Sequence, residues 1–175
     1  MYAPDLATTC QFASGPAVRA IGWLENGKPI PTGHTDPQFL VALRAHATDP
    51  CRWLPFAFAG MHFCDLGDCE RISGSQCVIV PAPSCLYIAP DLIVHYVEQH
   101  SYAPPAEFIA AVLACPEQCS DGYVALLLPF ASTFRLDADG VRSIAADAPA
   151  RRKVHAEAVA ERLARDLANR GNFKW

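Results

Sequence analysis

The chain has 175 residues, of which 51% are hydrophobic and 18% charged. This balance is typical of a globular protein and excludes a disordered chain. The formal net charge of −4 is unevenly spread, because residues 151–175 hold seven Lys/Arg against three Asp/Glu, so the remainder of the chain is acidic. An acidic body argues against a general nucleic-acid binder, whose whole domain is usually basic.

Eight cysteines raise the question of the redox compartment. The opening MYAPDLATTCQFASG is too polar for a secretion signal, and no run approaches the roughly 20 apolar residues of a membrane span. We therefore expect a cytosolic protein without membrane contact, in which cysteines stay reduced or bind a metal.

The N-terminal segment reads as a loose arm over residues 1–15, followed by a short hairpin. The pair Asn26-Gly27 stands between AIGWL and KPI and supplies the positive φ of a tight turn. Pro29 and Pro31 lack a backbone N–H, which confines the second arm of this hairpin to a sheet edge.

A helix is expected from about residue 36 to Asp49. Thr35 or Asp36 suits the N-cap, and Pro37 suits the first turn. The Asp49-Pro50 pair ends the helix, because the residue before a proline is driven out of helical geometry.

Apolar runs predict three strands in the middle of the chain. PFAFAGMHFC at 55–64 favours a strand, and CVIVP at 77–81 with CLYIA at 85–89 favours a hairpin. Prolines then bound two helices, over residues 90–100 and 105–115.

The last third is less regular until its final helix. GYVALLLPF at 122–130 fits either a helix or a buried strand, and Asp139-Gly140 predicts a hairpin over 132–144. Residues 149–170 predict a helix whose apolar stripe consists of Ala156, Val159, Ala160, Leu163 and Leu167.

Strands and helices interleave without a regular βαβ rhythm. We therefore expect an α+β fold in one domain spanning residues 1–175. Its small antiparallel sheet would consist of hairpins packed against about four helices.

The clearest candidate functional site in the sequence is the stretch GMHFCDLGDC, which contains one histidine and two cysteines. His62 and Cys64 lie two apart and would share one face of a strand, and the chain then turns back to bring Cys69 near Cys64. Four residues between the cysteines fall within the spacing of zinc-binding pairs, although buried cysteines are often inert packing. We interpret this stretch as part of a metal site.

Zinc takes four ligands, so the 90–100 helix must complete the set. Both His95 and His100 are candidates. At 100° per residue His100 falls on the apolar side of this helix and His95 lies round from it, which favours His100 pointing inward. The sequence leaves open which of them, or neither, is the remaining ligand.

A structural zinc is favoured over a catalytic one, since two thiolates weaken the Lewis acidity of the ion and no HExxH is present. Two alternatives stay open. The first is a zinc-dependent hydrolase with an open metal position, and the second is a redox-responsive regulator that loses zinc when Cys64 and Cys69 are oxidised.

Further segments strengthen the metal hypothesis through a resemblance. The elements GMHFC…C, YIAPDLIVHYVEQHSYAPP and EFIAAVLACP resemble those of a family of small uncharacterised bacterial proteins, over roughly residues 20–125. The resemblance implies His62, Cys64, Cys69, His95 and His100 as metal ligands. This chain departs from that family in having four residues, where the family has two, between its paired cysteines.

No catalytic set is recognisable in the chain, which has no glycine-rich phosphate loop and no nucleophile elbow. We therefore expect a non-enzymatic binding module. Its acidic body would suit an immunity-like or accessory protein that neutralises a basic protein partner.

Overall fold

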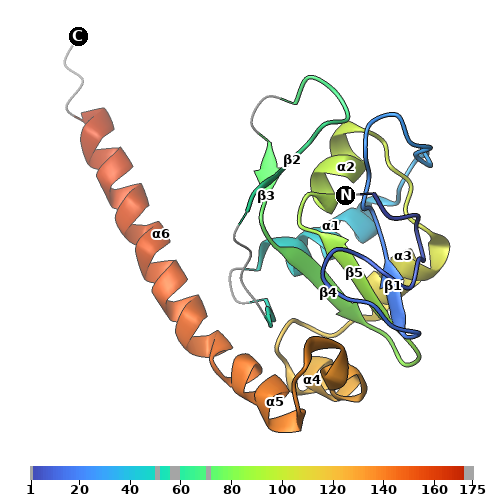
Figure 1. Cartoon of the computed structure of the whole chain (residues 1–175). Coiled ribbons are helices and arrows are strands. Elements are labelled where there is room, and N and C mark those ends of the chain that lie inside the picture. The colour runs from blue at the N-terminus through green and yellow to red at the C-terminus, as the bar shows by residue number, and fades with distance from the viewer. Residues whose placement is uncertain (1, 50–51, 56–59, 70–71, 172–175) are drawn as a thin grey trace.

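A three-stranded sheet forms the centre of the protein, whose computed structural model describes residues 2–49, 52–55, 60–69 and 72–171 (Figure 1). The strands are β1 (Val18–Ala20), β4 (Cys77–Pro81) and β5 (Leu86–Pro90), in the order β1-β5-β4. Every residue of β4 and β5 is buried, which agrees with the unbroken apolar runs that predict these strands. The predicted hairpin over these two strands is confirmed.

Alternation along β4 divides the core into two layers. Cys77 and Ile79 face one apolar cluster, while Val78 and Val80 face the other. Helices supply the far side of each layer. The layer of Val78 is covered by α1 (Pro37–Thr48), α2 (Ile93–Gln99) and α3 (Ala106–Ala114), and that of Ile79 by α4 (Asp121–Leu127), the 3₁₀ helix η1 (Leu128–Phe134) and α5 (Ala138–Ala146). The arrangement is an α+β fold, as the sequence predicts.

Local sequence signals explain where the first helix begins and ends. The Asp36 carboxylate accepts a 2.7 Å hydrogen bond from the Gln38 amide, and Pro37 occupies the first turn. Phe39 and Leu43 are buried one turn apart against the sheet. The predicted helix over these residues is confirmed.

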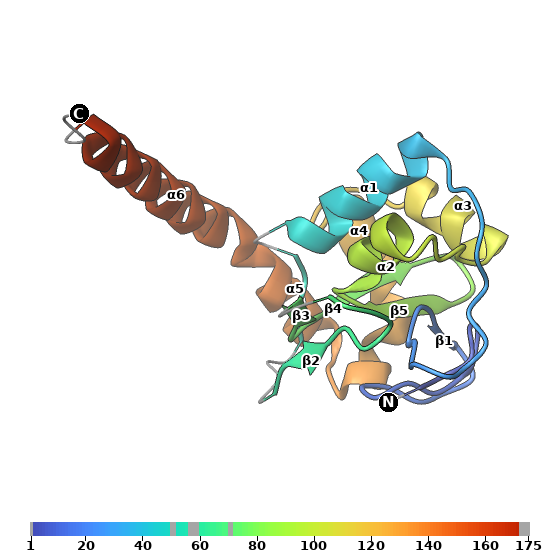
Figure 2. The same ribbon diagram turned by 90° about the horizontal axis from the view of Figure 1, so that it is seen from above.

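Two elements stand apart from the layered core. The first is a two-stranded ribbon formed by β2 (His62–Phe63) and β3 (Ser73–Gly74), which run antiparallel. The second is α6 (Ala148–Gly171), a long helix that projects away from the body in both views (Figures 1 and 2). Among the helices that the structure describes, none has the length and apolar character needed to cross a bilayer.

Several local predictions fail, beginning with the loose arm over residues 1–15. Ala3 bridges Trp23, and Cys10 and Ala13 are buried in the core. The Asp5 carboxylate accepts hydrogen bonds from the Gly22 amide and from Tyr102. The apolar residues of this segment are short and scattered among polar ones. They show no periodicity from which this packing could be predicted.

The expected hairpin through Asn26-Gly27 is also wrong. Gly27 does adopt a positive φ of 79°, but the chain beyond it bridges Tyr102 through Thr32 rather than returning along β1. Strand β1 instead pairs in parallel with β5, so the sheet is mixed and not purely antiparallel. This long-range pairing depends on burial against β5, which local turn chemistry does not report.

The predicted hairpin over residues 132–144 is wrong, because this segment contains the end of η1 and most of α5. Asp137 caps α5 by accepting a 2.8 Å bond from the Gly140 amide, and Val141 and Ala145 are buried at helical spacing. The ambiguous run 122–130 is helical as well. Part of the strand predicted at 55–64 lies outside the described residues, and within them the strand covers only His62 and Phe63.

Candidate metal centre

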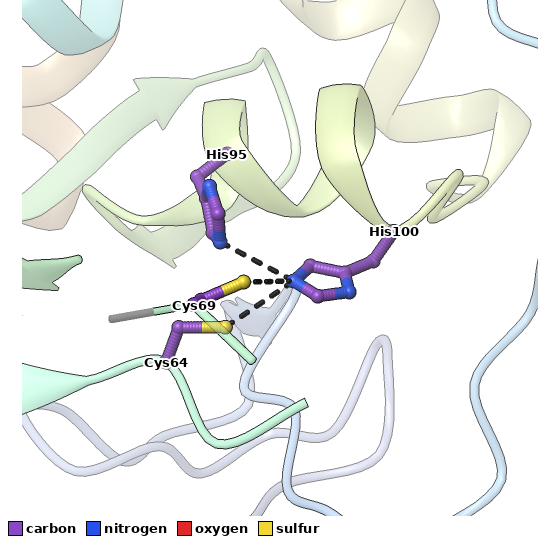
Figure 3. A group of neighbouring side chains, drawn as sticks. All are labelled: Cys64, Cys69, His95 and His100. Atoms are coloured by element: carbon purple, nitrogen blue, oxygen red, sulfur yellow. Dashed lines mark hydrogen bonds between the residues drawn. The ribbon is translucent and has the colours of Figure 1, made fainter. Parts of the chain in front are cut away.

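Four side chains from two distant segments converge beside α2. They are Cys64 and Cys69 from the loop of the β2–β3 ribbon, and His95 and His100 from α2 and its C-cap. Each offers one donor atom, and these atoms all lie within 4.8 Å of one another (Figure 3). Cys64 is buried and the other three are partly buried.

The ribbon loop brings its two cysteines together by backbone hydrogen bonds. The Cys64 amide donates to the Ile72 carbonyl at 2.9 Å, which extends the β2–β3 pairing by one step toward the connecting loop. The Cys69 amide donates to the Gly67 carbonyl at 2.8 Å, so the chain reverses within the loop. Leu66 packs on the apolar layer below and anchors the turn.

The end of α2 explains how both histidines reach the same point. Five residues apart on an ideal helix, His95 and His100 would differ by about 140° in direction. The helix ends at Gln99, however, and His100 is the C-cap with φ −113° and ψ 7°. Ser101 then takes a positive φ of 53° and turns the chain away. The structure therefore brings both histidines into the group, so the two are not alternatives for a single ligand position.

The ring nitrogen Nε2 of His100 is the centre of the cluster. It lies 3.3 Å from Cys64 Sγ, 3.3 Å from Cys69 Sγ and 3.2 Å from His95 Nε2. A single imidazole nitrogen has one proton or one lone pair, so it cannot form three hydrogen bonds in these directions. Around a tetrahedral zinc ion, N···N and N···S distances of about 3.3 and 3.6 Å follow from ordinary bond lengths. The three distances to His100 Nε2 are close to these values, and the four residues could hold a metal ion.

Burial controls the protonation of the cluster. It raises the pKa of the Cys64 thiol, and the neighbouring Cys69 adds to this effect while a hydrogen bond from the Leu66 amide opposes it. Burial also lowers the pKa of His95, with a further contribution from His100. Neutral imidazole is the form that binds metals, whereas a thiol with a raised pKa is a poor nucleophile.

His62, which the sequence also suggests as a ligand, lies outside this group of four. Its Nε2 is 3.3 Å from the hydroxyl of Tyr96, a fully buried side chain of α2. The sequence does not indicate this role of Tyr96, because the residue lies on the apolar stripe of its helix and is therefore expected to be a core residue. Burial, with the nearby Cys64 and Asp65, raises the pKa of Tyr96 well above its usual range, so the phenol stays protonated.

The two described acidic residues near the cysteines, Asp65 and Asp68, are not buried acceptors for the cluster. Asp65 and Asp68 are exposed, and Glu70 lies outside the described residues. The remaining cysteines outside the cluster are packing residues where the structure describes them. Burial raises the pKa of Cys115 to about 12 and raises that of Cys77 further, which makes both poor nucleophiles.

Residues 1–113 match the family described as Domain of unknown function (DUF7919). The chain belongs to this family. Its uncharacterised status agrees with the resemblance noted in the sequence. No curated protein and no solved structure matches the chain. The DUF7919 region includes all four residues of the cluster, whereas α4, α5 and α6 follow it.

Proposed function

We propose that this DUF7919 protein is a non-enzymatic binding module in which a zinc ion fixes the β2–β3 ribbon to α2. Cys64, Cys69, His95 and His100 would be the ligands. The convergence of these four donors on one point carries the proposal. Two soft thiolates and two imidazoles are a donor set that suits zinc.

The number of donors favours a structural ion over a catalytic one. Catalytic zinc sites keep a position open for water, whereas structural sites are closed by four protein ligands. Here four side chains place their donor atoms within 4.8 Å of one another, and His62 Nε2 lies 3.3 Å from the Tyr96 hydroxyl. A hydrolase with three ligands and a bound water is therefore the less favoured function.

The strand pairing of the ribbon contributes little to holding its position. Its strands are two residues long, and Met61 and Phe63 are 62% and 54% exposed. Isolated pairs of strands are at best marginally stable in water. A metal that joins the ribbon to α2 would supply the missing free energy and keep the surface of the module rigid.

The charge distribution supports a basic protein as the partner. Residues 1–150 carry fifteen Asp/Glu and seven Lys/Arg, an acidic surplus of eight charges. Such a surface accelerates association with a basic partner and disfavours acidic ones. We propose an immunity-like or accessory role, in which the module occupies a basic surface of another protein.

Metal analysis of two matched cysteine variants tests the site. Cys69 and Cys115 are both partly buried, but only Cys69 belongs to the cluster. The purified protein is expected to hold one equivalent of zinc, Cys69→Ser to lose it, and Cys115→Ser to retain it. Zinc absent from the wild type, or retained at full occupancy by Cys69→Ser, would contradict the proposal.

Cobalt substitution distinguishes a structural metal site from a catalytic one. A four-coordinate S₂N₂ site gives intense visible absorption with thiolate charge-transfer bands, and these bands should not change when small anions such as azide are added. A spectrum that changes on addition of azide would reveal an exchangeable position and favour the hydrolase.

A further inference from the structure

A cavity of about 400 Å³ lies between the N-terminal segment and the β2–β3 ribbon. This volume falls within the range of about 300–1,000 Å³ that is typical of small-molecule sites. Segments far apart in the sequence form its lining, which consists of residues 11–12, 23, 60–62, 74–76 and 90–91. The cavity is distinct from the Cys/His cluster, since none of the four cluster residues is part of this lining.

One side of the cavity is an apolar wall formed by Phe12, Trp23 and Pro90. The rings of Phe12 and Trp23 pack edge to face, with centroids 5.1 Å apart and planes at 61°. The Trp23 indole N–H donates a 2.9 Å hydrogen bond to the Ile88 carbonyl, so its polar group is already satisfied. This wall therefore suits an apolar or aromatic part of a ligand.

The Asp91 carboxylate has one oxygen bound by the protein and one oxygen that is not. Its Oδ2 accepts hydrogen bonds from the amides of Ser75 at 3.2 Å and Gln76 at 3.1 Å, and Arg52 Nη2 lies 3.9 Å from the same atom. Its Oδ1 forms no hydrogen bond with a described residue. A Cβ at Gly74 would overlap this Oδ1, so the missing side chain there leaves room for the carboxylate. Oδ1 remains as an acceptor for a ligand.

The charges around the cavity favour a cation. The described lining contains no Lys or Arg, and Asp91 is its acidic side chain. Residues 1–150 carry an acidic surplus of eight charges, which adds to the attraction for a cation and disfavours an anion. The side-chain oxygens of Gln11 and Ser75, both exposed residues of the lining, are further hydrogen-bond acceptors.

We propose that this cavity binds a small organic cation, namely a protonated primary amine that carries an aromatic group. The ammonium donates to Asp91 Oδ1, and the aromatic group packs on the apolar wall of Phe12, Trp23 and Pro90. Primary amines are protonated at neutral pH, and hydrogen bonds between charged groups are roughly twice as strong as neutral ones. A small-molecule site of this kind goes beyond the proposed binding of a basic protein.

The ribbon supplies another side of the cavity and connects it to the Cys/His cluster. His62 lies opposite Gly74 in the ribbon, and both residues line the cavity. His62 Nε2 is 3.3 Å from the Tyr96 hydroxyl, and Cys64 follows two residues later. The position of this side rests on the proposed metal, whereas Asp91 and the apolar wall do not. Metal content measured on the titrated samples therefore separates a failure of the metal proposal from a failure of this one.

Titration of the full-length protein, as purified, with three small molecules tests the ligand class by NMR. The probe 2-phenylethylamine should bind with a dissociation constant on the order of 1 mM, as expected for a ligand of this size. The largest amide shifts should occur at Phe12, Ser75 and Gln76. The alcohol 2-phenylethanol lacks the charge and n-butylamine lacks the ring, so each should bind at least about tenfold more weakly.

Replacement of the carboxylate tests the role of Asp91. Asp91→Asn keeps an oxygen for the amides of Ser75 and Gln76 but removes the charge, and should weaken 2-phenylethylamine binding by at least about tenfold. The matched control is Asp139→Asn on α5, whose side chain is 94% exposed and which should leave binding unchanged.

Charges introduced at the rim give a second readout in which folding is not at risk. Gln11 is exposed beside the cavity, and Gln38 is exposed on α1. Gln11→Lys should weaken and Gln11→Glu should strengthen 2-phenylethylamine binding, each by about threefold, through repulsion or attraction of the ammonium. Gln38→Lys should have no effect.

The proposal is overturned if 2-phenylethylamine shows no saturable binding, if 2-phenylethanol binds equally well, or if the amide shifts lie away from the cavity. Equal affinity for n-butylamine would also contradict it, and would instead indicate a site for an aliphatic ammonium such as a lysine of a partner protein. If circular dichroism shows that Asp91→Asn unfolds, the Gln11 variants decide, and unchanged affinity in Gln11→Lys counts against the proposal.

Discussion

The described part of the chain contains two antiparallel strand pairs that are held in different ways. In β4–β5 five residue pairs are in register and every residue is buried. In β2–β3 two pairs are in register, and Phe63 is half exposed. Burial of apolar area stabilises the first pair, whereas we propose that the second is stabilised by a metal bound to the Cys/His cluster, which joins its loop to α2. The same antiparallel pairing thus belongs to the core in β4–β5 and forms a surface element in β2–β3.

Removing the metal should produce the largest difference between the two pairs. After chelation, amide exchange at Cys64 and Ile72 is expected to accelerate by roughly tenfold or more, because these ribbon amides lose the tie to α2. Amides of β4 and β5 should retain their protection. Hydrogen exchange followed by NMR measures both, and equal acceleration in the two pairs would show that the metal stabilises the whole fold.

Truncating one isoleucine in each pair compares them by mutation. Ile79 is 1% exposed in β4, and Ile79→Ala should lower the free energy of unfolding by about 3 kcal/mol, through lost burial and the cavity that remains. Ile72 beside β3 is 42% exposed, and Ile72→Ala should change the free energy of unfolding by less than about 0.5 kcal/mol. Urea denaturation measures both, and similar losses would contradict the distinction.

The contact between Tyr96 and His62 adds a smaller tie between α2 and the ribbon. Tyr96→Phe removes the hydroxyl that lies 3.3 Å from His62 Nε2, at an expected cost of about 1 kcal/mol. Zinc content should remain at one equivalent in this variant and in His62→Gln, since His62 lies outside the group of four. Loss of zinc from His62→Gln would instead place His62 among the ligands.

Acid should weaken the core through His46, with the smallest effect of the four. His46 is 6% exposed, and its Nδ1 lies 3.3 Å from Gln118 Nε2. Burial lowers the pKa of His46 in the folded protein. As pH falls through about 6.5, the unfolded chain therefore binds a proton that the folded chain does not, and stability declines until the lowered pKa is reached.

The comparison that isolates this effect uses His46→Gln in metal-free protein. The wild type should lose stability between neutral and mildly acidic pH faster than the variant, because other titrating groups are common to both. Parallel pH profiles from urea denaturation would show that His46 makes no contribution.

The sequence by itself determined the elements whose signals are local. Asp36 and Pro37 define the start of α1, the runs CVIVP and CLYIA define the central hairpin, and two cysteines separated by four residues mark the loop of the Cys/His cluster. Capping, strand burial and ligand spacing act over a few residues, so they can be read from a short window.

Only the tertiary structure decided which partners these elements meet. The sequence could not show that β1 joins β5 in parallel, or that the end of α2 at Gln99 lets His95 and His100 reach the same point. Nor could it show that His62 meets Tyr96 while the stripe of α6 stays uncovered. These outcomes depend on contacts between residues far apart in the chain, whose free energy comes from packing and not from local propensity.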